Sequence, residues 1–388
     1  MLKGTKGKVL PTAMVGSFPK PSWFNQSLHG RPFKVAMGDS QYREQYLDAV
    51  AACVNEQERA GLDILTDGDT RFDLEVGGRS WFFYTIERLN GISGFRDKSH
   101  FLDYGEFKPG HILYEVQEAY HPPAVTGKIT RGPLHFTAVW KTAQKMTSRP
   151  LKFGTISATC LPMMLWNEHY KNDHDMIWDI ACAQNEELKE LAAAGCPVIQ
   201  MEEPPHHFAC CTQPPASEKD LEFYTKAFNR EIEGVKTEIW AHTCWGNPNQ
   251  QSFYWERPSY ERSLPYLLAL NADVLGLECA SNEGRDLGLL KHVKTKKKIA
   301  IGVVDHTRTT VESPQLVASI IRKALEHVPP ERLIITADCG FGREGLSRRI
   351  AQYKCIALVM GTNIVRKQLG LEQIYVRAAD PKYAFRED

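Results

Sequence analysis

The sequence predicts an α/β fold, specifically a (β/α)8 TIM barrel with an insertion between its second and third strands. Three observations predict it: eight short β-branched and apolar runs, helical patterns between the later runs, and reactive or polar residues directly after nearly every run. Apolar strands that alternate with helices are typical of a parallel sheet covered on both faces. In such a barrel the active site lies at the carboxyl ends of the strands, so catalytic and binding residues are expected at these positions.

Eight short apolar and β-branched runs are expected to form the strands of the barrel. They are the runs at 12–16, 62–66, 153–157, 197–201, 237–241, 273–277, 298–303 and 332–336. Before the fourth run, the segment 175–195 has the spacing of an amphipathic helix. Its apolar residues share one helix face: Ile177, Ile180, Ala181, Leu188 and Leu191.

The spacing of the strands is uneven, since about 85 residues separate the second run from the third. One helix needs far fewer, so we expect an insertion over about 70–150. Its charged and glycine-containing portion, 95–132, is expected to form a hairpin or a lid. No low-complexity segment or linker marks a second domain, so residues 1–388 are expected to form a single barrel domain with a polar surface tail at about 375–388.

Charge and hydropathy restrict the partners. Lys and Arg total 47 and Asp and Glu total 47, so the net charge is zero, which argues against nucleic acid or anionic lipid as a partner. Neither a signal-peptide core nor an apolar run of about 18 residues is present. We expect a soluble, cytoplasmic protein that acts on small molecules, with its oligomeric state left open. The ten cysteines include no CxxC pair, so most are expected to be reduced, buried thiols.

Reactive or polar groups follow nearly every expected strand. In chain order they are Gly16 and Ser17, Asp67 and Asp69, Thr159 and Cys160, Glu202 and Glu203, His242 and Cys244, Glu278, Asp305 and His306, and Asp338 and Cys339. Since the carboxyl ends of barrel strands meet at one mouth, these groups are expected to lie around a common site.

Four of these residues have the chemistry of metal ligands. His242, Cys244, Glu278 and Cys339 supply an imidazole, two thiolates and a carboxylate, a set that suits tetrahedral Zn²⁺. His242 and Cys244 are two positions apart and share one side of an extended chain, so both can reach one ion. The alternatives are a packed histidine beside buried cysteines, or a closed zinc site with a purely structural purpose.

The same residues carry a resemblance to a known family. The segments AHTCWG (241–246), ADVLGLE (272–278) and ADCGFGREGLSRR (337–349) resemble the zinc-ligand motifs in the catalytic barrel of the cobalamin-independent methionine synthases. Further segments are similar to motifs of that family and occur in the same order: VGSFPKP (15–21), TDGD (66–69), IQMEEP (199–204) and GVVDH (302–306). The resemblance spans about residues 10 to 370.

The resemblance implies that these four residues bind a zinc ion that holds a substrate thiol as a thiolate for attack on an electrophilic carbon. It also implies that Asp69 and Glu202 bind the ammonium group of homocysteine, and that Gly16 and Ser17 bind its carboxylate. His306, aided by Asp305, would donate a proton to the leaving group. The family usually has Asp-Glu-Pro where this chain has Glu202, Glu203 and Pro204.

Other interpretations of single residues stay open at this point. Asp69 could be an ordinary turn residue, Glu202 and Glu203 an exposed pair of carboxylates, and His306 a surface residue. Arginines that follow strand ends could instead hold an anionic group: Arg308, Arg343 and Arg348.

The expected function is zinc-dependent methyl or alkyl transfer to a thiol, most simply methyl transfer to homocysteine from a methylfolate or a methylcorrinoid. The alternatives are an enzyme that joins another thiol, such as coenzyme M, to an epoxide or other alkyl donor, and a dealkylating relative. A zinc hydrolase is disfavoured because the chain has no HxH pair.

Overall fold

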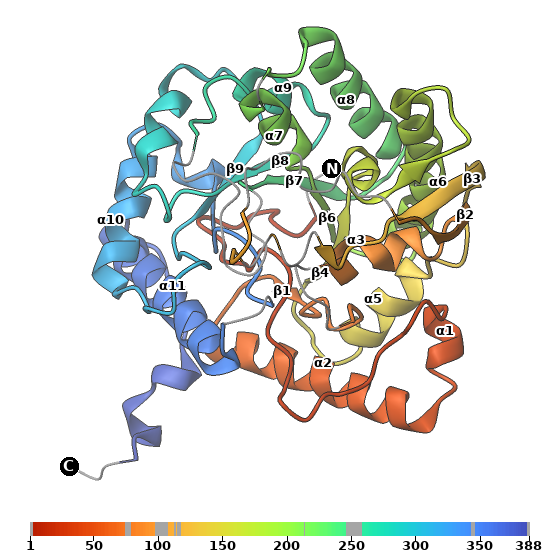
Figure 1. Cartoon of the computed structure of the whole chain (residues 1–388). Helices are drawn as coiled ribbons and strands as arrows, with labels where there is room; N and C mark the ends of the chain where they lie inside the picture. Colours follow the sequence, from red (N-terminus) through yellow and green to blue (C-terminus); the bar gives the residue numbers. More distant parts are fainter. Residues whose placement is uncertain are drawn as a thin grey trace.

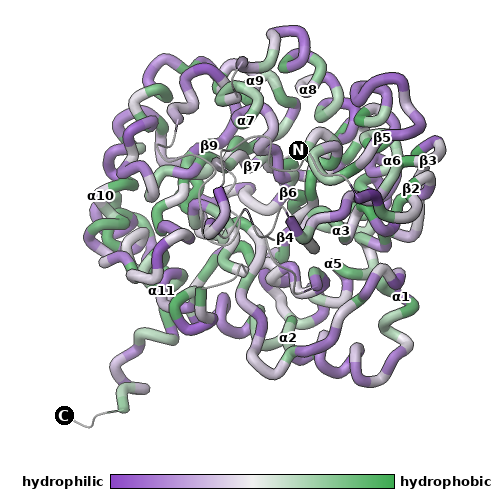
Figure 2. The backbone as a smooth tube through the Cα atoms, in the orientation of Figure 1, coloured by the Kyte–Doolittle hydropathy of each residue, from purple (hydrophilic) through white to green (hydrophobic). Residues whose placement is uncertain are grey.

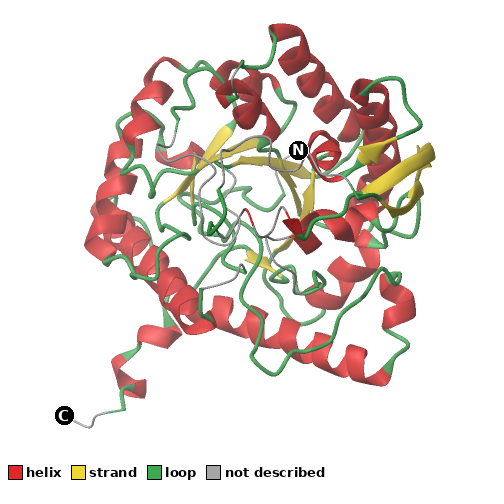
Figure 3. Ribbon diagram, viewed as in Figure 1, coloured by secondary structure: helices red, strands yellow, loops and turns green. Residues whose placement is uncertain are grey.

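The computed structural model describes residues 3–73, 79–97, 108–111, 114, 118–212, 214–245, 258–342 and 346–385. Seven strands form one parallel sheet, in the order in which they occur along the chain. They are β1 (Leu65–Thr66), β4 (Leu151–Ile156), β6 (Val198–Glu202), β7 (Glu238–Thr243), β8 (Val274–Leu277), β9 (Lys298–Gly302) and β10 (Leu333–Thr336). The sheet is curled, with helices around its outside (Figure 3).

These seven strands coincide with seven of the eight expected runs. The first run forms two isolated parallel bridges instead, Thr12 with Ile335 and Ala13 with Ile64. The N–H of Ala13 donates to the carbonyl of Ile335 at 3.0 Å, and the N–H of Ile64 donates to the carbonyl of Thr12 at 3.0 Å. The segment therefore lies between the two edges of the sheet, with β1 on one side and β10 on the other.

Helices cover the outer face of the sheet (Figure 1). They are α1 (Phe33–Ala36), α2 (Ser40–Ala60), α3 (Arg79–Ile86), α5 (Phe136–Gln144), α6 (Asp173–Ala193), α7 (Pro205–Cys211), α8 (Glu218–Glu231), α9 (Leu264–Ala269), α10 (Pro314–Leu325) and α11 (Arg348–Gln368). Among the described residues, 3-10 helices add to them: η2 (Ala158–Met164), η4 (Arg285–His292), η5 (Pro330–Arg332), η6 (Arg377–Ala379) and η7 (Pro381–Tyr383).

The helix expected at 175–195 is confirmed as α6. Asn172 caps its first turn by accepting a hydrogen bond from the N–H of Asp175 at 2.9 Å, and acidic residues in that turn suit the helix dipole. The helix ends before Gly195, whose φ of +101° a residue with a side chain would adopt only with strain. All five apolar residues expected on its inner face are buried.

Between β1 and β4 the chain forms a second, smaller sheet. In it, β2 (Asn90–Phe95) pairs antiparallel with β3 (Pro123–Thr130), and β3 pairs parallel with β5 (Trp166–Asn167), which follows β4. The portion 95–132, which was expected to form a hairpin or lid, begins at the last residue of β2 and contains β3. Residues 98–107, 112–113 and 115–117 of that portion lie outside the described residues.

Side chains on the inner side of the curled sheet fill its interior. Seven apolar residues make one layer: Ala13, Ile64, Val198, Trp240, Val274, Ala300 and Ile334. Near the amino ends of the strands, Glu238 accepts hydrogen bonds from the N–H and hydroxyl of Thr5 at 2.9 and 2.8 Å, and Lys298 donates to the carbonyl of Thr5 at 3.0 Å. The interior is thus filled from this end, and the chemistry lies at the other.

The helices around the sheet carry both hydrophilic and hydrophobic residues (Figure 2), as expected for helices with one face against the sheet. Within the described part of the chain, no helix is long and apolar enough to cross a membrane. The segment after α11 carries η6, which contacts α2, and then η7, and the C-terminal end of the chain points away from the sheet (Figure 1). Of the expected tail, residues 386–388 lie outside the described part.

Candidate functional site

Four side chains meet at the carboxyl ends of three strands. His242 is the second-last residue of β7, and Cys244 directly follows that strand. Glu278 follows β8, and Cys339 follows β10. One potential ligand atom from each residue lies within 4.8 Å of the others, and all four residues are buried. The parallel register produces this arrangement, because it pairs His242 with Gly276, two residues before Glu278. The convergence expected of these four residues is present.

The donor set fits a metal ion. Nε2 of His242 is buried and has no hydrogen-bond partner of regular geometry among the residues that the structure describes. A buried polar atom without a partner is costly, and a metal ion would satisfy it. Burial alone would lower the pKa of His242, but the nearby charge of Glu202 contributes to a net rise. Two sulfurs, one imidazole and one carboxylate together match the ligands that zinc prefers.

Glu202 lies beside this group, at the end of β6. Its Oε2 is 3.8 Å from Nε2 of His242, and its side chain is buried. The interpretation of Glu202 and Glu203 as an exposed pair is therefore wrong. Glu203 is also buried, and it accepts a hydrogen bond from Thr159 at 2.6 Å and contacts Nδ1 of His206 at 2.8 Å. Of the two carboxylates, only Glu202 borders the candidate ligands.

Asp69 is both a turn residue and a buried acid. Its φ of +51° and its N–H donated to Asp67 at 2.9 Å place it in the turn after β1. Its carboxylate lies 3.0 Å from Arg71, and a Cβ built on Gly16 would come within 2.9 Å of Oδ2. Burial is the largest cause that raises the pKa of Asp69, and Glu202 contributes to the rise. The two acids are therefore close enough to interact.

The segment of Gly16 and Ser17 contacts the loop that carries Cys339. The carbonyl of Ser17 accepts hydrogen bonds from the N–H of Phe341 at 2.7 Å and of Gly342 at 3.1 Å. A Cβ on Gly340 would come within 2.4 Å of the Ser17 hydroxyl oxygen, so this approach requires a glycine. The candidate substrate residues thus lie around the same end of the sheet as the candidate ligands.

Asp305 and His306 follow β9 and are both buried, which contradicts the surface interpretation of His306. Oδ1 of Asp305 accepts hydrogen bonds from the N–H and hydroxyl of Thr307 at 2.8 and 2.6 Å, and its Oδ2 lies 3.4 Å from Nε of Arg308. These contacts hold the turn in which His306 lies.

The arginines considered from the sequence differ in position. Arg308 is exposed beside Asp305, and Arg348 begins α11 and pairs with Glu56 at 2.9 Å. Arg343 lies outside the described residues. The arginine that the sequence did not single out is Arg71, which is fully buried against Asp69 and donates to the carbonyl of Gly154 at 2.6 Å.

A buried polar chain behind the site was not expected either. Lys152 donates to the side chain of Gln200, and Gln200 donates to Oε1 of Glu202. Gln200 also donates to the carbonyl of Val15 at 2.7 Å. Burial lowers the pKa of Lys152 well below its usual range. The signal in the sequence is a lysine directly before the apolar run 153–157, between Leu151 and Phe153.

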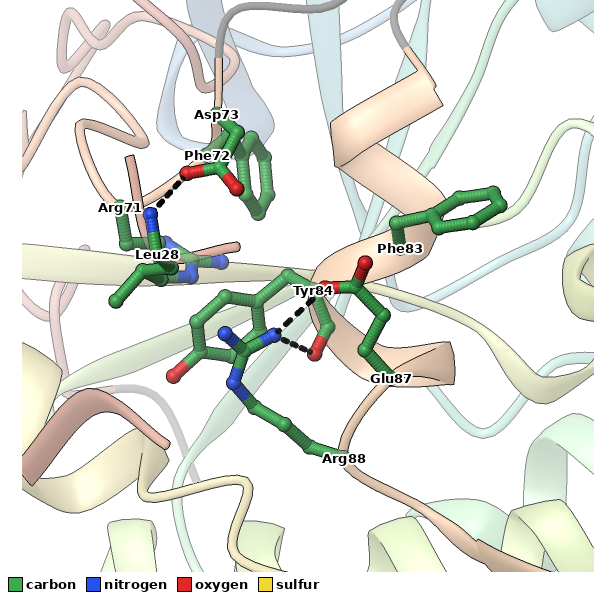
Figure 4. A pocket seen from close by; sticks show the side chains of 8 residues that line it. All are labelled: Leu28, Arg71, Phe72, Asp73, Phe83, Tyr84, Glu87 and Arg88. Carbon is green, nitrogen blue, oxygen red and sulfur yellow. Dashed lines mark hydrogen bonds and ion pairs between the residues drawn. The ribbon is translucent and has the colours of Figure 1, made fainter. Parts of the chain in front are cut away.

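A separate pocket lies at the start of the inserted segment (Figure 4). It contains about 220 Å³ of space outside the atoms, part of it open to solvent, and eight residues line it: Leu28, Arg71, Phe72, Asp73, Phe83, Tyr84, Glu87 and Arg88. Asp73 accepts a hydrogen bond from the N–H of Leu28 at 2.6 Å, and Arg88 donates to the carbonyl of Tyr84 at 2.7 Å. None of the four candidate ligands lines this pocket.

Fold and site together define a class, namely α/β enzymes with a candidate metal group at the carboxyl edge of a parallel sheet. The family model for the cobalamin-independent synthase catalytic domain matches residues 10–359. The chain therefore belongs to the cobalamin-independent methionine synthase family, as its motifs indicated, and it is a methyltransferase.

Individual relatives agree with this assignment. A methionine synthase of Saccharolobus solfataricus is 31% identical over 367 residues, which are 94% of this chain and 97% of that protein. The structure of a B12-independent methionine synthase from Shewanella sp. W3-18-1, in complex with selenomethionine, matches with a TM-score of 0.76 and 28% identity over 93% of this chain and 99% of that one. A putative B12-independent methionine synthase from Listeria monocytogenes shares the fold, with a TM-score of 0.63 and 18% identity over 94% and 99% of the two chains.

Proposed function

We propose that this protein is a zinc-dependent methyltransferase that methylates the sulfur of homocysteine. The observation that carries the proposal is the group of four buried ligand atoms within 4.8 Å of one another, from His242, Cys244, Glu278 and Cys339. These residues would hold the zinc ion, which when bound lowers the pKa of a substrate thiol and keeps it nucleophilic at neutral pH. The Shewanella relative holds selenomethionine, the selenium analogue of the proposed product.

The other proposed groups bind and orient the amino acid. The carboxylates of Asp69 and Glu202 would accept the ammonium of homocysteine, and the hydroxyl and backbone of Gly16 and Ser17 would bind its carboxylate. A thiol with a sulfonate tail would meet the two acids instead, which disfavours coenzyme M. The burial of Asp69 and Glu202 would exclude water from the bound ammonium group.

Proton delivery is assigned to His306. In this proposal its imidazole protonates the leaving group of the methyl donor, and Asp305 fixes the turn that presents it. The methyl donor is a methylfolate or a methylcorrinoid, and the described residues favour neither.

The proposal includes the finer architecture. The segment 12–16 would complete an eight-stranded barrel, because its bridges already join it to Ile64 beside β1 and to Ile335 of β10. Residues 1–388 would form one domain, with an insertion at about 70–150 and a surface tail at about 375–388. The protein would act in the cytoplasm on small molecules, without nucleic acid or a membrane as a partner.

The zinc environment tests the proposal. Zinc content is measured first, followed by zinc K-edge absorption with homocysteine and with coenzyme M as the comparison thiol. One zinc per chain that gains a sulfur neighbour with homocysteine alone is the expected result. A zinc shell that neither thiol changes would make the ion structural and overturn the proposal, and a response to coenzyme M alone would transfer the reaction to another thiol.

A further inference from the structure

Asp338 occupies the position immediately before Cys339, and it is not among the residues proposed to bind zinc, bind homocysteine or transfer a proton. Its side chain is fully buried at the end of β10. Oδ1 accepts hydrogen bonds from the N–H groups of Cys279 and Ala280, both at 2.8 Å, and Oδ2 accepts one from the N–H of Ser281 at 2.7 Å. Three successive backbone donors that follow Glu278 therefore end on one carboxylate.

The backbone of Asp338 makes a further hydrogen bond, to the segment that follows β9. Its N–H donates to the carbonyl of Val304 at 3.0 Å, just ahead of Asp305 and His306. A Cβ on Gly302 would come within 2.0 Å of Oδ1 of Asp338 and 2.5 Å of its Cα, so this close packing requires a glycine. Asp338 thus contacts both the residues that follow β9 and the loop that follows β8.

These contacts restrict how the candidate ligands can move. Glu278 is one residue before the first N–H donor, and Cys339 is one residue after the acceptor. Hydrogen bonds between a buried carboxylate and backbone N–H groups are strong, since the acceptor is charged and water is excluded. The loops that leave β8 and β10 are consequently joined at a point adjacent to both ligands.

We propose that Asp338 is a positioning residue, which holds Glu278 and Cys339 at the separation that one metal ion requires. It acts through the N–H groups of residues 279–281 and does not itself bind the ion. This inference rests on the proposed function, because it concerns the affinity of the site for zinc. Ligands that are oriented by neighbouring hydrogen bonds bind metal roughly 10–100-fold more tightly than unsupported ones.

The test compares Asp338→Ala and Asp338→Asn with Asp273→Ala. Asp273 is the matched control, since its carboxylate accepts a hydrogen bond from the N–H of Ile239 at 2.9 Å and lies just before the opposite end of β8. Zinc affinity is measured by competition with a chromophoric chelator at fixed pH, and circular dichroism checks the fold of the metal-free proteins. Hydrogen exchange of the amides of residues 279–281 gives a readout that needs neither metal nor activity.

Asp338→Ala is expected to weaken zinc binding roughly 10–100-fold and to accelerate exchange at residues 279–281, with the stoichiometry preserved at saturating zinc. Asp338→Asn should lose less zinc affinity than Asp338→Ala, because its amide oxygen still accepts hydrogen bonds. Some loss should remain, because its NH₂ group is a donor and faces the N–H of Ser281. Asp273→Ala should bind zinc like the wild type. If Asp338→Ala does not fold, Asp338→Asn decides.

Two results would overturn the inference, and they are distinguishable. Folded Asp338 variants that bind zinc with wild-type affinity would remove the positioning role and leave the proposed function intact. A wild-type protein without stoichiometric zinc would overturn the proposed function and this inference together.

Discussion

Oε2 of Glu202 lies 3.8 Å from Nε2 of His242, so a candidate substrate acid directly adjoins a candidate metal ligand. The adjacent register of β6 and β7 produces this contact, because Glu202 pairs with His242. A thiol bound to an ion at His242 would therefore have its amino group within reach of Glu202, provided that the molecule is as short as homocysteine.

Replacement of Glu202 tests this relationship. Glu202→Gln keeps the shape of the side chain and removes its charge, so the KM for homocysteine should rise roughly 10–100-fold, the equivalent of about 1.5–3 kcal/mol for a hydrogen bond to a charged group. Zinc content should be unchanged. Steady-state kinetics and metal analysis check both expectations.

Glu203→Gln is the control for this variant. Glu203 is buried and hydrogen-bonded to Thr159, so its replacement should lower thermal stability without raising the KM for homocysteine. An unchanged KM in Glu202→Gln would contradict the assignment of Glu202 to the ammonium group.

The metal ligands make a second prediction. Cys339→Ser should weaken zinc binding by more than about 100-fold, because even the loss of a hydrogen bond to a ligand costs roughly 10–100-fold. Cys279→Ser is matched to it, since Cys279 is buried beside Glu278 and its sulfur contacts the carbonyl of Leu277 at 3.7 Å. Zinc titration of both variants is decisive: equal affinities would exclude Cys339 as a ligand.

His306 should matter for turnover and not for binding. His306→Asn is expected to keep zinc and homocysteine affinity and to lower kcat by roughly 10²–10⁴-fold, the usual contribution of a positioned proton donor. His207→Asn removes another buried histidine, which contacts Ser263 at 2.9 Å, and should leave kcat near the wild-type value. A kcat of His306→Asn close to that of the wild type would rule out the proton-transfer assignment.

The pH dependence of substrate binding follows from Asp69. Burial raises the pKa of Asp69 to about 7, with Asp67 and Glu202 adding to the rise. The carboxyl is therefore protonated below that pH and charged above it, and only the charged form attracts an ammonium group. The KM for homocysteine should fall as the pH rises through neutrality.

Asp69→Asn should abolish this trend, since the amide does not titrate, and should give a high KM throughout. The KM is measured at several pH values between 6 and 8 for both proteins. A wild-type KM that is constant over this interval would show that Asp69 does not contact the ammonium group.

Much of the site could be predicted because its signals are local. His242 and Cys244 are two residues apart at a strand end, and Glu278 and Cys339 each end an apolar run. In a closed parallel barrel the carboxyl ends of all strands surround one mouth. The positions of these residues after their strands were therefore enough to predict that they meet. Asp69 and Glu202 were found in the same way.

The supporting groups could not be predicted, because their partners are distant in the chain. Asp338 contacts backbone donors 57 to 59 residues away, and an aspartate before a cysteine carries no mark of that. The link from Lys152 through Gln200 to Glu202 depends likewise on which side chains point inward at the same height of the sheet.

The strand and helix pattern, the family and the chemical types at the strand ends follow from the sequence, because periodicity and short motifs are properties of neighbouring residues. The tertiary contacts add that the carboxylate of Glu202, and not that of Glu203, lies beside the ligand atoms, that segment 12–13 lies between β1 and β10, and that Asp338 joins two ligand loops. The physical reason is that burial and hydrogen bonding between distant segments depend on the register and curl of the whole sheet, which no local stretch of sequence specifies.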